Sequence, residues 1–352
     1  MPDFNIKNIK ELAKNAFEKI KSHRFFQKRE TSPSETSSKF IAFVSSWWHI
    51  LLFSVFAFIC LYYPIGGFII NDIDRKSYDI SQPNKQQSAT VEMMSFLINR
   101  EVIEKNWTPN LPFFFPSYFL DNMPNFQLGI MSAVSNTANA LSKKIAAPIT
   151  GIEKEDHLKI AAKLLKYDGR IWMFSPQNRF TPVPSANSQY RKARKRLIKY
   201  NQDLSDGTLV FYRNPEDLAF FLRAVNKDLQ KSVAALENQI REYSSNWIDS
   251  KEDDVFYYNQ GKVYAYYLLL SALGQDYKDI IVNNDLYQDW THTIKALENG
   301  SGINPLVVRN GGFNSITCPN HLNYLAFYAL KSKNVNGRIA AGLEKSNIRT
   351  RQ

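Results

Sequence analysis

The run from Phe40 to Ile70 contains no Lys, Arg, Asp or Glu. Within it, the stretch from Ile41 to Tyr63 is apolar enough to cross a bilayer as one helix, because about 20 apolar residues span the hydrocarbon core. No comparable stretch follows in the rest of the chain. The sequence therefore predicts one transmembrane helix over residues 40–64, ahead of a large domain outside the membrane.

The remainder of the chain has the composition of a folded protein. Of its 352 residues, 44% are hydrophobic and 14% aromatic, which supplies a core and excludes disorder for most of the chain. No Gly/Ser-rich or Pro-rich linker divides the part beyond the apolar run. We expect a basic N-terminal segment over 1–39, a stalk over 65–87, one helical domain over 88–345 and a polar tail over 346–352.

Positive charge is distributed unevenly about the apolar run. The basic residues near it are Lys21, Arg24, Lys28, Arg29 and Lys39 before it, and Arg75, Lys76 and Lys85 after it. Cytoplasmic flanks of membrane helices carry such an excess, so we expect a cytoplasmic N-terminus. In a bacterium with two membranes, this places the chain in the inner membrane and its domain in the periplasm. A cleaved signal peptide is the alternative, but no small-x-small cleavage site follows the apolar core.

Hydrophobic periodicity predicts a mainly α, helical-bundle-like domain with a few short strands. Apolar residues recur at steps of three and four over 91–105, 126–141, 150–167, 189–200, 214–243, from 253 onward, 284–298 and 319–332. The helix after Asn214 has the clearest start, since a capping side chain is followed by Pro215 and two acidic residues. The almost wholly apolar stretch Val263 to Leu270 predicts a central buried helix. Only Leu209–Arg213 and Leu306–Arg309 have the pattern of strands.

The segment Leu111 to Leu120 is rich in aromatic residues and proline, and it predicts an extended loop. Such an apolar loop must be buried in its own core, against lipid or in a partner. A turn from Asp121 to Asn125 follows it. We take these two segments as the candidate partner or ligand surface, with Phe113, Phe114, Phe115, Asp121, Asn122 and Asn125 as its members.

The net charge of +11 is concentrated in two places, the first 39 residues and one basic helix. That helix carries Arg191, Lys192, Arg194, Lys195 and Arg196. For an anchored protein the nearest polyanion is the phospholipid headgroup layer, so we interpret these residues as a lipid-facing or solvated patch. Nucleic acid is the alternative ligand by charge, and the predicted compartment argues against it.

Few residues point to catalytic chemistry. The histidines lack the spacing of metal ligands and Cys60 and Cys318 lie far apart, so we expect no metal, no cofactor and no internal disulfide. Asn310, Gly311 and Gly312, ahead of a helix carrying His321, are typical of a tight turn or of a backbone anion site. Asp121, Asp253 and Asp254 are candidates for glycoside cleavage, although each also has a cap or turn role.

Several strings of residues resemble one family when they are taken together. They are Leu120–Phe126 (Leu-Asp-Asn-Met-Pro-Asn-Phe), Leu209–Arg213, Asp253–Tyr257, and Asn310–Phe313 with Asn320–Leu322. The chain resembles an uncharacterised bacterial inner-membrane family, domain of unknown function 2333, from about Val91 to Leu343. The resemblance implies an envelope protein with a single N-terminal anchor. The family has no established activity, so no catalytic residue is carried over.

Two hypotheses follow for the function. In the first, the chain is a non-enzymatic inner-membrane protein whose periplasmic domain binds a protein partner as a scaffold or assembly factor. In the second, it is an envelope hydrolase or a lipid or cell-wall ligand-binding protein. The second requires Asp121, Asp253, Asn310 and His321 to line one cleft.

Overall fold

The computed structural model describes residues 35–78, 86–144, 147–148, 156–174, 180–243, 250–311 and 319–351. The described chain is mainly α-helical, as predicted. It divides into two compact units, Met1–Cys60 and Leu61–Gln352. Gly312, Cys318 and the expected helix start at Thr150 lie outside the described residues.

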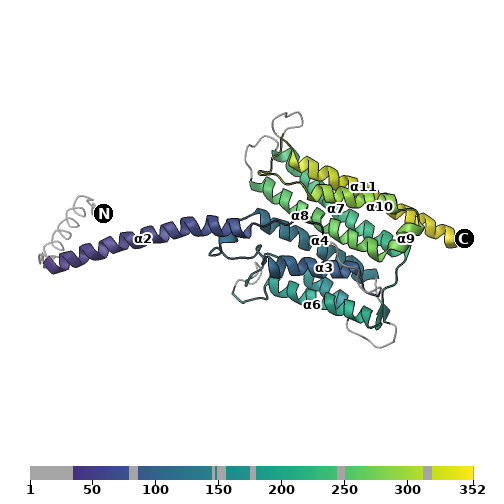
Figure 1. The fold of residues 1–352 in the computed structure, drawn as a ribbon, viewed down its shortest axis with the longest axis horizontal. Helices are drawn as coiled ribbons and strands as arrows, with labels where there is room; N and C mark the ends of the chain where they lie inside the picture. Colours follow the sequence, from purple (N-terminus) through teal and green to yellow (C-terminus); the bar gives the residue numbers. More distant parts are fainter. Residues whose placement is uncertain are drawn as a thin grey trace, which may run out of the picture. The chain divides into compact units, whose positions relative to one another are not determined.

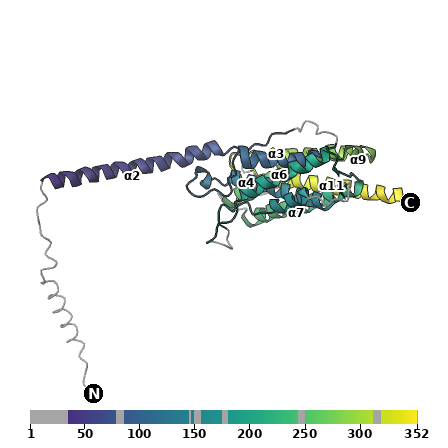
Figure 2. The ribbon, with the colours of Figure 1, turned by 90° about the horizontal axis from the view of Figure 1, so that it is seen from below.

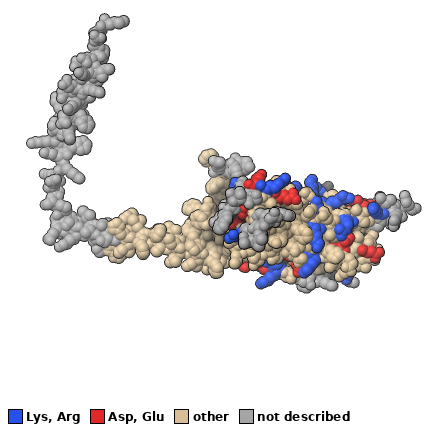
Figure 3. All heavy atoms as spheres, turned by 90° about the horizontal axis from the view of Figure 1, so that it is seen from above, with Lys and Arg blue, Asp and Glu red and all other residues tan. Residues whose placement is uncertain are grey.

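The apolar run forms most of one long helix, α2 (Glu35–Ile70), which continues through Pro64. Its part from Trp47 to Ile70 is long and apolar enough to cross a membrane. On the face shown in Figure 3, the described side chains of α2 include no Lys, Arg, Asp or Glu. The helix continues through Pro64 and two glycines and ends six residues beyond the predicted boundary at residue 64, since residues 65–70 are still uncharged.

Two parallel helices, α4 (Asn122–Lys144) and α8 (Ser250–Asp276), form the centre of the second unit. They cross closely at two glycines. A Cβ atom on Gly129 would lie 2.0 Å from the carbonyl oxygen of Tyr258, and one on Gly261 would lie 2.1 Å from that of Phe126. The prediction of a central buried helix is confirmed, since nearly every residue from Val263 to Leu270 is buried.

Two sets of helices cover opposite sides of the central pair (Figures 1 and 2). The first side consists of α3 (Ala89–Asn99), α5 (His157–Leu165) and α6 (Ala186–Ser205). The other consists of α7 (Pro215–Tyr243), α10 (Tyr287–Ser301) and α11 (His321–Arg351), with the short α9 (Lys278–Asn283) leading from α8 to α10. The domain is thus a helical bundle around the central pair.

Helix α7 begins as predicted, because the Asn214 side chain accepts a hydrogen bond of 2.8 Å from the backbone N–H of Asp217. Its partner α11 was predicted to end near residue 332, and that prediction is wrong. The helix runs to Arg351 because Val335, Ile339 and Leu343 continue a buried stripe. Polar residues between them, and Gly337, conceal this periodicity in the sequence.

Strand structure is limited to one short pair in the described residues. Strand β1 (Ala147–Pro148) pairs antiparallel with β2 (Leu209–Val210), which lies within the predicted strand at 209–213. The predicted strand at 306–309 is wrong. Leu306 and Val307 are exposed there, and only the neighbouring Asn310 forms an isolated bridge, with Asn320. The aromatic loop is also more regular than expected, since it contains a 3-10 turn, η3 (Pro116–Phe119).

Part of the predicted stalk lies against the bundle. The segment Asn71–Tyr78, which we call the strap, packs Ile73 and Tyr78 on the core of the second unit. The next described helix, α3, is capped at its start by the side chain of Ser88. The buried carboxylate of Asp276, at the end of α8, accepts hydrogen bonds from Ser88, Ala89 and Thr90 and so holds the start of α3 in place.

Candidate functional site

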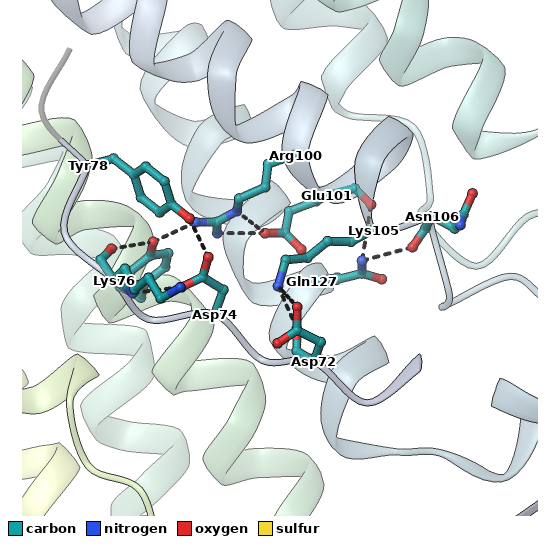
Figure 4. Close-up of polar contacts among 10 residues, drawn as sticks. Asp72, Asp74, Lys76, Tyr78, Arg100, Glu101, Lys105, Asn106 and Gln127 are labelled. Atoms are coloured by element: carbon teal, nitrogen blue, oxygen red, sulfur yellow. Dashed lines mark hydrogen bonds and ion pairs between the residues drawn. The ribbon is translucent and has the colours of Figure 1, made fainter. Parts of the chain in front are cut away.

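A buried charged pair lies where the strap meets the bundle (Figure 4). Arg100 and Glu101 are 2% and 1% exposed, and Nε of Arg100 donates to Oε1 of Glu101 over 2.6 Å. The same guanidinium donates to the Tyr264 hydroxyl over 2.6 Å and lies 5.3 Å from the ring of Tyr78. Burial alone lowers the pKa of Arg100, but Glu101 and Tyr264 outweigh it and raise the pKa, so Arg100 stays charged.

Polar contacts order the strap and join it to the bundle beside this pair (Figure 4). The carboxylate of Asp74 accepts hydrogen bonds from the Tyr78 hydroxyl and from the backbone N–H of Lys76. The Tyr264 hydroxyl donates to the carbonyl oxygen of Lys76 over 2.8 Å. Lys105 forms an ion pair of 2.8 Å with Asp72. The Tyr264–Lys76 and Lys105–Asp72 contacts fasten the strap to the bundle, whereas the Asp74 carboxylate orders the strap internally.

One side chain, Gln127, holds the turn beneath this network. Its oxygen accepts hydrogen bonds from the backbone N–H and the hydroxyl of Thr108, and its nitrogen donates to the carbonyl oxygens of Glu101 and Asn106. The turn follows a π-helical segment, η2 (Arg100–Glu104), and ends at Asn106 with a positive φ of 60°. All four hydrogen-bonding positions of the Gln127 amide are used, so this side chain fixes the local backbone and offers no free group to a ligand.

The predicted aromatic loop is exposed. Phe113, Phe114 and Phe115 are 68%, 48% and 38% exposed, so the reading that places the loop in its own core is wrong. Packing does not bury these rings, because the loop lies at the end of the bundle beside α2 instead of between helices. The hydroxyls of Tyr62 and Tyr63 on α2 donate to the carbonyl oxygens of Phe114 and Phe113, over 3.1 and 2.8 Å.

The predicted acidic residues come together where α4 and α8 begin. Asn125 donates to Oδ1 of Asp254 over 2.6 Å and to the carbonyl oxygen of Asp121, whose carboxylate accepts from the backbone N–H of Asn122. Burial, followed by the charges of Asp121 and Asp254, raises the pKa of Asp253 to about 6. Asp253 is therefore an acid able to hold its proton close to neutral pH.

Asn310 and His321 belong to a different set of contacts. Asn310 donates to the carbonyl oxygens of Gln239 and Ile240 on α7, and Nδ1 of His321 accepts from the backbone N–H of Arg309. Burial and then the charge of Arg309 lower the pKa of His321. No hydrogen bond or ion pair given by the described residues joins these two side chains to Asp121 or Asp253.

The glycine turn ahead of α11 uses its amide internally. The backbone N–H of Gly311 donates to the carbonyl oxygen of Pro319 over 3.3 Å, and its carbonyl oxygen accepts from the side chain of Asn320. The tight-turn interpretation therefore fits Gly311 better than the anion site, since the amide already has a partner. Gly312 lies outside the described residues.

The basic patch lies on α6. Arg191, Lys192 and Lys195 are exposed, whereas Arg194 and Arg196 are half-buried. Arg196 contacts Nδ1 of His157 on α5 at 3.0 Å, so part of the patch holds α5 and α6 together. Within the described part of the chain, no group of three or more His, Cys, Asp or Glu side chains is placed to hold a metal ion.

A lysine-lined groove between α4 and α5 was not foreseen from the sequence. It has a volume of about 630 Å³, and its basic residues are Lys143, Lys159, Lys163 and Lys166. A second groove of about 420 Å³ shares Asn139 and Lys166 with it. Part of this groove could have been predicted from the sequence, because Lys159, Lys163 and Lys166 follow one face of a helix. Their meeting with Lys143 depends on how α4 packs against α5.

Comparison with known proteins places part of this chain in a bacterial context. No curated protein and no solved structure matches it. One family model, described as an uncharacterized protein conserved in bacteria (DUF2333), does match, and the matched region includes the Asp121–Phe126 turn and all of α4 to α7. The resemblance inferred from the sequence is confirmed: over residues 106–246, the chain matches the bacterial family DUF2333.

Proposed function

We propose that this chain is a non-enzymatic scaffold protein, anchored in the bacterial inner membrane by α2, whose helical domain binds a protein partner in the periplasm. One observation carries the proposal. The apolar helix continues directly into contacts with the bundle, and the strap after it contacts Arg100 through Tyr78 and Tyr264 through Lys76. A domain held in this way stays close to the bilayer surface.

The orientation of the proposed anchor rests on charge. Five basic residues between Lys21 and Lys39 precede the apolar run, and the residues directly after it include Asp72 and Asp74. This asymmetry favours a cytoplasmic N-terminus and a periplasmic domain. The match to a family conserved in bacteria agrees with a bacterial origin for the chain.

An exposed apolar stripe on α11 supports the proposed protein partner. Tyr324, Phe327 and Leu330 are exposed and lie three residues apart, on one face of the helix. Leu306 and Val307, in the loop that leads toward α11, are exposed as well. Clustered apolar side chains of this size on a soluble surface are typical of an interaction site.

Photo-crosslinking in living cells tests the proposal. A photoreactive amino acid at Phe327, which is 57% exposed, should give a discrete adduct with one protein. Tyr287, which is 61% exposed at the start of α10, is the matched control and should give none. If positions 324, 327 and 330 all yield no protein adduct, the scaffold role through α11 is wrong.

The second candidate is an envelope hydrolase or a cell-wall ligand-binding protein, and the observation in its favour is the effect of the Asp121 charge on Asp253. Asn310 and His321 contact other residues, so of the four side chains expected in one cleft only the acidic pair supports this alternative. A carboxylic acid with a pKa of about 6 suits a general acid. Under this alternative, Asp253→Asn should abolish release of soluble fragments from purified cell wall, while Asp254→Asn should reduce it less. If the unmodified protein releases no soluble fragments, the hydrolase hypothesis is wrong.

A further inference from the structure

The exposed aromatic side chains beside α2 form a surface that we call the aromatic base. It consists of Phe113, Phe114, Phe115, Tyr118 and Phe119, all of which are at least 38% exposed. Leu111 to Leu120 includes no charged residue. Exposure of so many neighbouring aromatic rings to water would be unfavourable, at roughly 25 cal/mol for each Å² of apolar surface.

The aromatic base is attached to the candidate membrane span itself. Besides the two hydrogen bonds from Tyr62 and Tyr63, the rings of Tyr63 and Phe119 make an edge contact with centroids 4.8 Å apart. Pro116 lies so close to Gly66 that a Cβ atom there would approach it to 2.5 Å. The loop therefore packs on residues 62–67 of the helix.

The position of these contacts along α2 sets the depth of the loop. A hydrocarbon core needs about 20 helical residues, so a span counted from Phe40 ends near Cys60, and one counted from Trp47 ends near Gly66. Both ends fall at, or next to, the residues that contact the aromatic base. A loop in contact with these residues lies at the border between acyl chains and headgroups whenever α2 crosses the bilayer.

A second loop extends the same surface. Trp172 makes an edge contact with Phe114, with centroids 6.2 Å apart, and it is exposed together with Met173 and Phe174. Tryptophan and tyrosine are enriched at membrane interfaces, since their rings prefer the headgroup region. The charged side chains of the strap, beginning with Asp72, come next along the chain on the side away from the span.

We propose that the aromatic base and Trp172 are inserted into the interfacial layer of the bilayer, so that the domain is seated on the lipid rather than held away from it. The inference rests on the proposed anchoring by α2 and names lipid as the occupant of this surface. A protein partner covering the same rings is the competing outcome. Lipid is favoured because the loop is fixed to the span and shares its depth.

Depth-dependent fluorescence quenching tests this in the full-length chain. In a Cys60→Ser, Cys318→Ser background, single cysteines replace Phe113, Phe56 or Tyr287, which are 68%, 64% and 61% exposed. Each carries an environment-sensitive dye, and the protein is reconstituted in phosphatidylcholine–phosphatidylglycerol nanodiscs with or without brominated acyl chains. Circular dichroism checks that each variant keeps the helical content of the unmodified chain.

The expected result is strong loss of emission at position 56, partial loss with a blue-shifted spectrum at position 113, and no loss at position 287. Loss at position 56 without loss at position 113 would overturn the inference and leave the anchor intact. No loss at position 56 would overturn the anchor itself. If position 113 is blue-shifted but unquenched, and crosslinks to protein in cells, a protein occupies the aromatic base.

Discussion

Arg100 and Glu101 place two opposite charges in the interior, directly beside the residues that follow the anchor. A buried ion pair gains attraction in a low dielectric but loses hydration, so its net effect on stability is small. Loss of one partner lowers stability strongly, because the other charge is left buried without compensation. The pair therefore makes the clamp on the strap sensitive to single substitutions.

Glu101→Leu should lower the free energy of unfolding by about 3–5 kcal/mol, since it leaves the Arg100 guanidinium buried and without its carboxylate. The double variant Arg100→Met, Glu101→Leu should recover much of that loss. Denaturant unfolding in detergent micelles, followed by circular dichroism, measures both. A double variant as unstable as the single one would contradict this account.

Asp253→Asn should stabilise the protein at neutral pH. The folded state raises the pKa of this carboxyl to about 6, so the stability that it contributes is fully present below about pH 4 and is lost as the pH rises through 6. At pH 7.5 the variant should gain about 1 kcal/mol, allowing for the partial exposure of the group.

Thermal unfolding at pH 4 and at pH 7.5 measures the gain from Asp253→Asn, which should disappear at the lower pH. Glu237→Gln on the exposed face of α7 gives the baseline for removal of a surface carboxylate. An equal gain at both pH values would show that the raised pKa is not its source.

Helices α4 and α8 approach each other closely, and two glycines permit it. Periodicity predicted both helices but not their crossing, because a glycine within a helix gives no sign of which neighbour it meets. The same limit explains α11, whose full length depends on a stripe buried against other helices. Elements whose ends are set by local caps, such as Asn214 at α7, were predicted more accurately.

Gly129→Ala should destabilise the protein by about 2–3 kcal/mol, because the new methyl group would overlap the carbonyl oxygen of Tyr258 and force the helices apart. Gly337→Ala is the matched control. Its methyl group would meet only the Asn226 side chain at 3.7 Å, so it should be neutral or stabilise by up to about 1 kcal/mol. Equal losses in the two variants would rule out the close crossing as the cause.

For the whole molecule, the proposed anchor explains why α2 exposes uncharged, mostly apolar side chains from Trp47 to Ile70. Cys60 is exposed on α2 and so reports on the surroundings of that helix. In water its thiol would react readily with a hydrophilic reagent. In the hydrocarbon core a charged, membrane-impermeant reagent cannot reach it.

In a Cys318→Ser background, Cys60 should resist a membrane-impermeant maleimide in intact membranes and become labelled after solubilisation in denaturing detergent. A Tyr287→Cys, Cys60→Ser, Cys318→Ser chain should be labelled from the outer face of spheroplasts, which tests the periplasmic orientation. Labelling of Cys60 in intact membranes would contradict the span. Protection of Tyr287→Cys in spheroplasts would reverse the orientation.

Local sequence is sufficient to predict the apolar helix, the mainly α architecture and the cap at Asn214, because each depends on residues within a few positions of one another. It also brought Asp121 and Asp253 forward as candidates. Tertiary structure alone decided that the aromatic loop is exposed beside α2, that Arg100 joins Tyr78 and Tyr264, and that Asn310 and His321 lie in a separate set of contacts. These depend on packing between distant segments, which local periodicity does not encode.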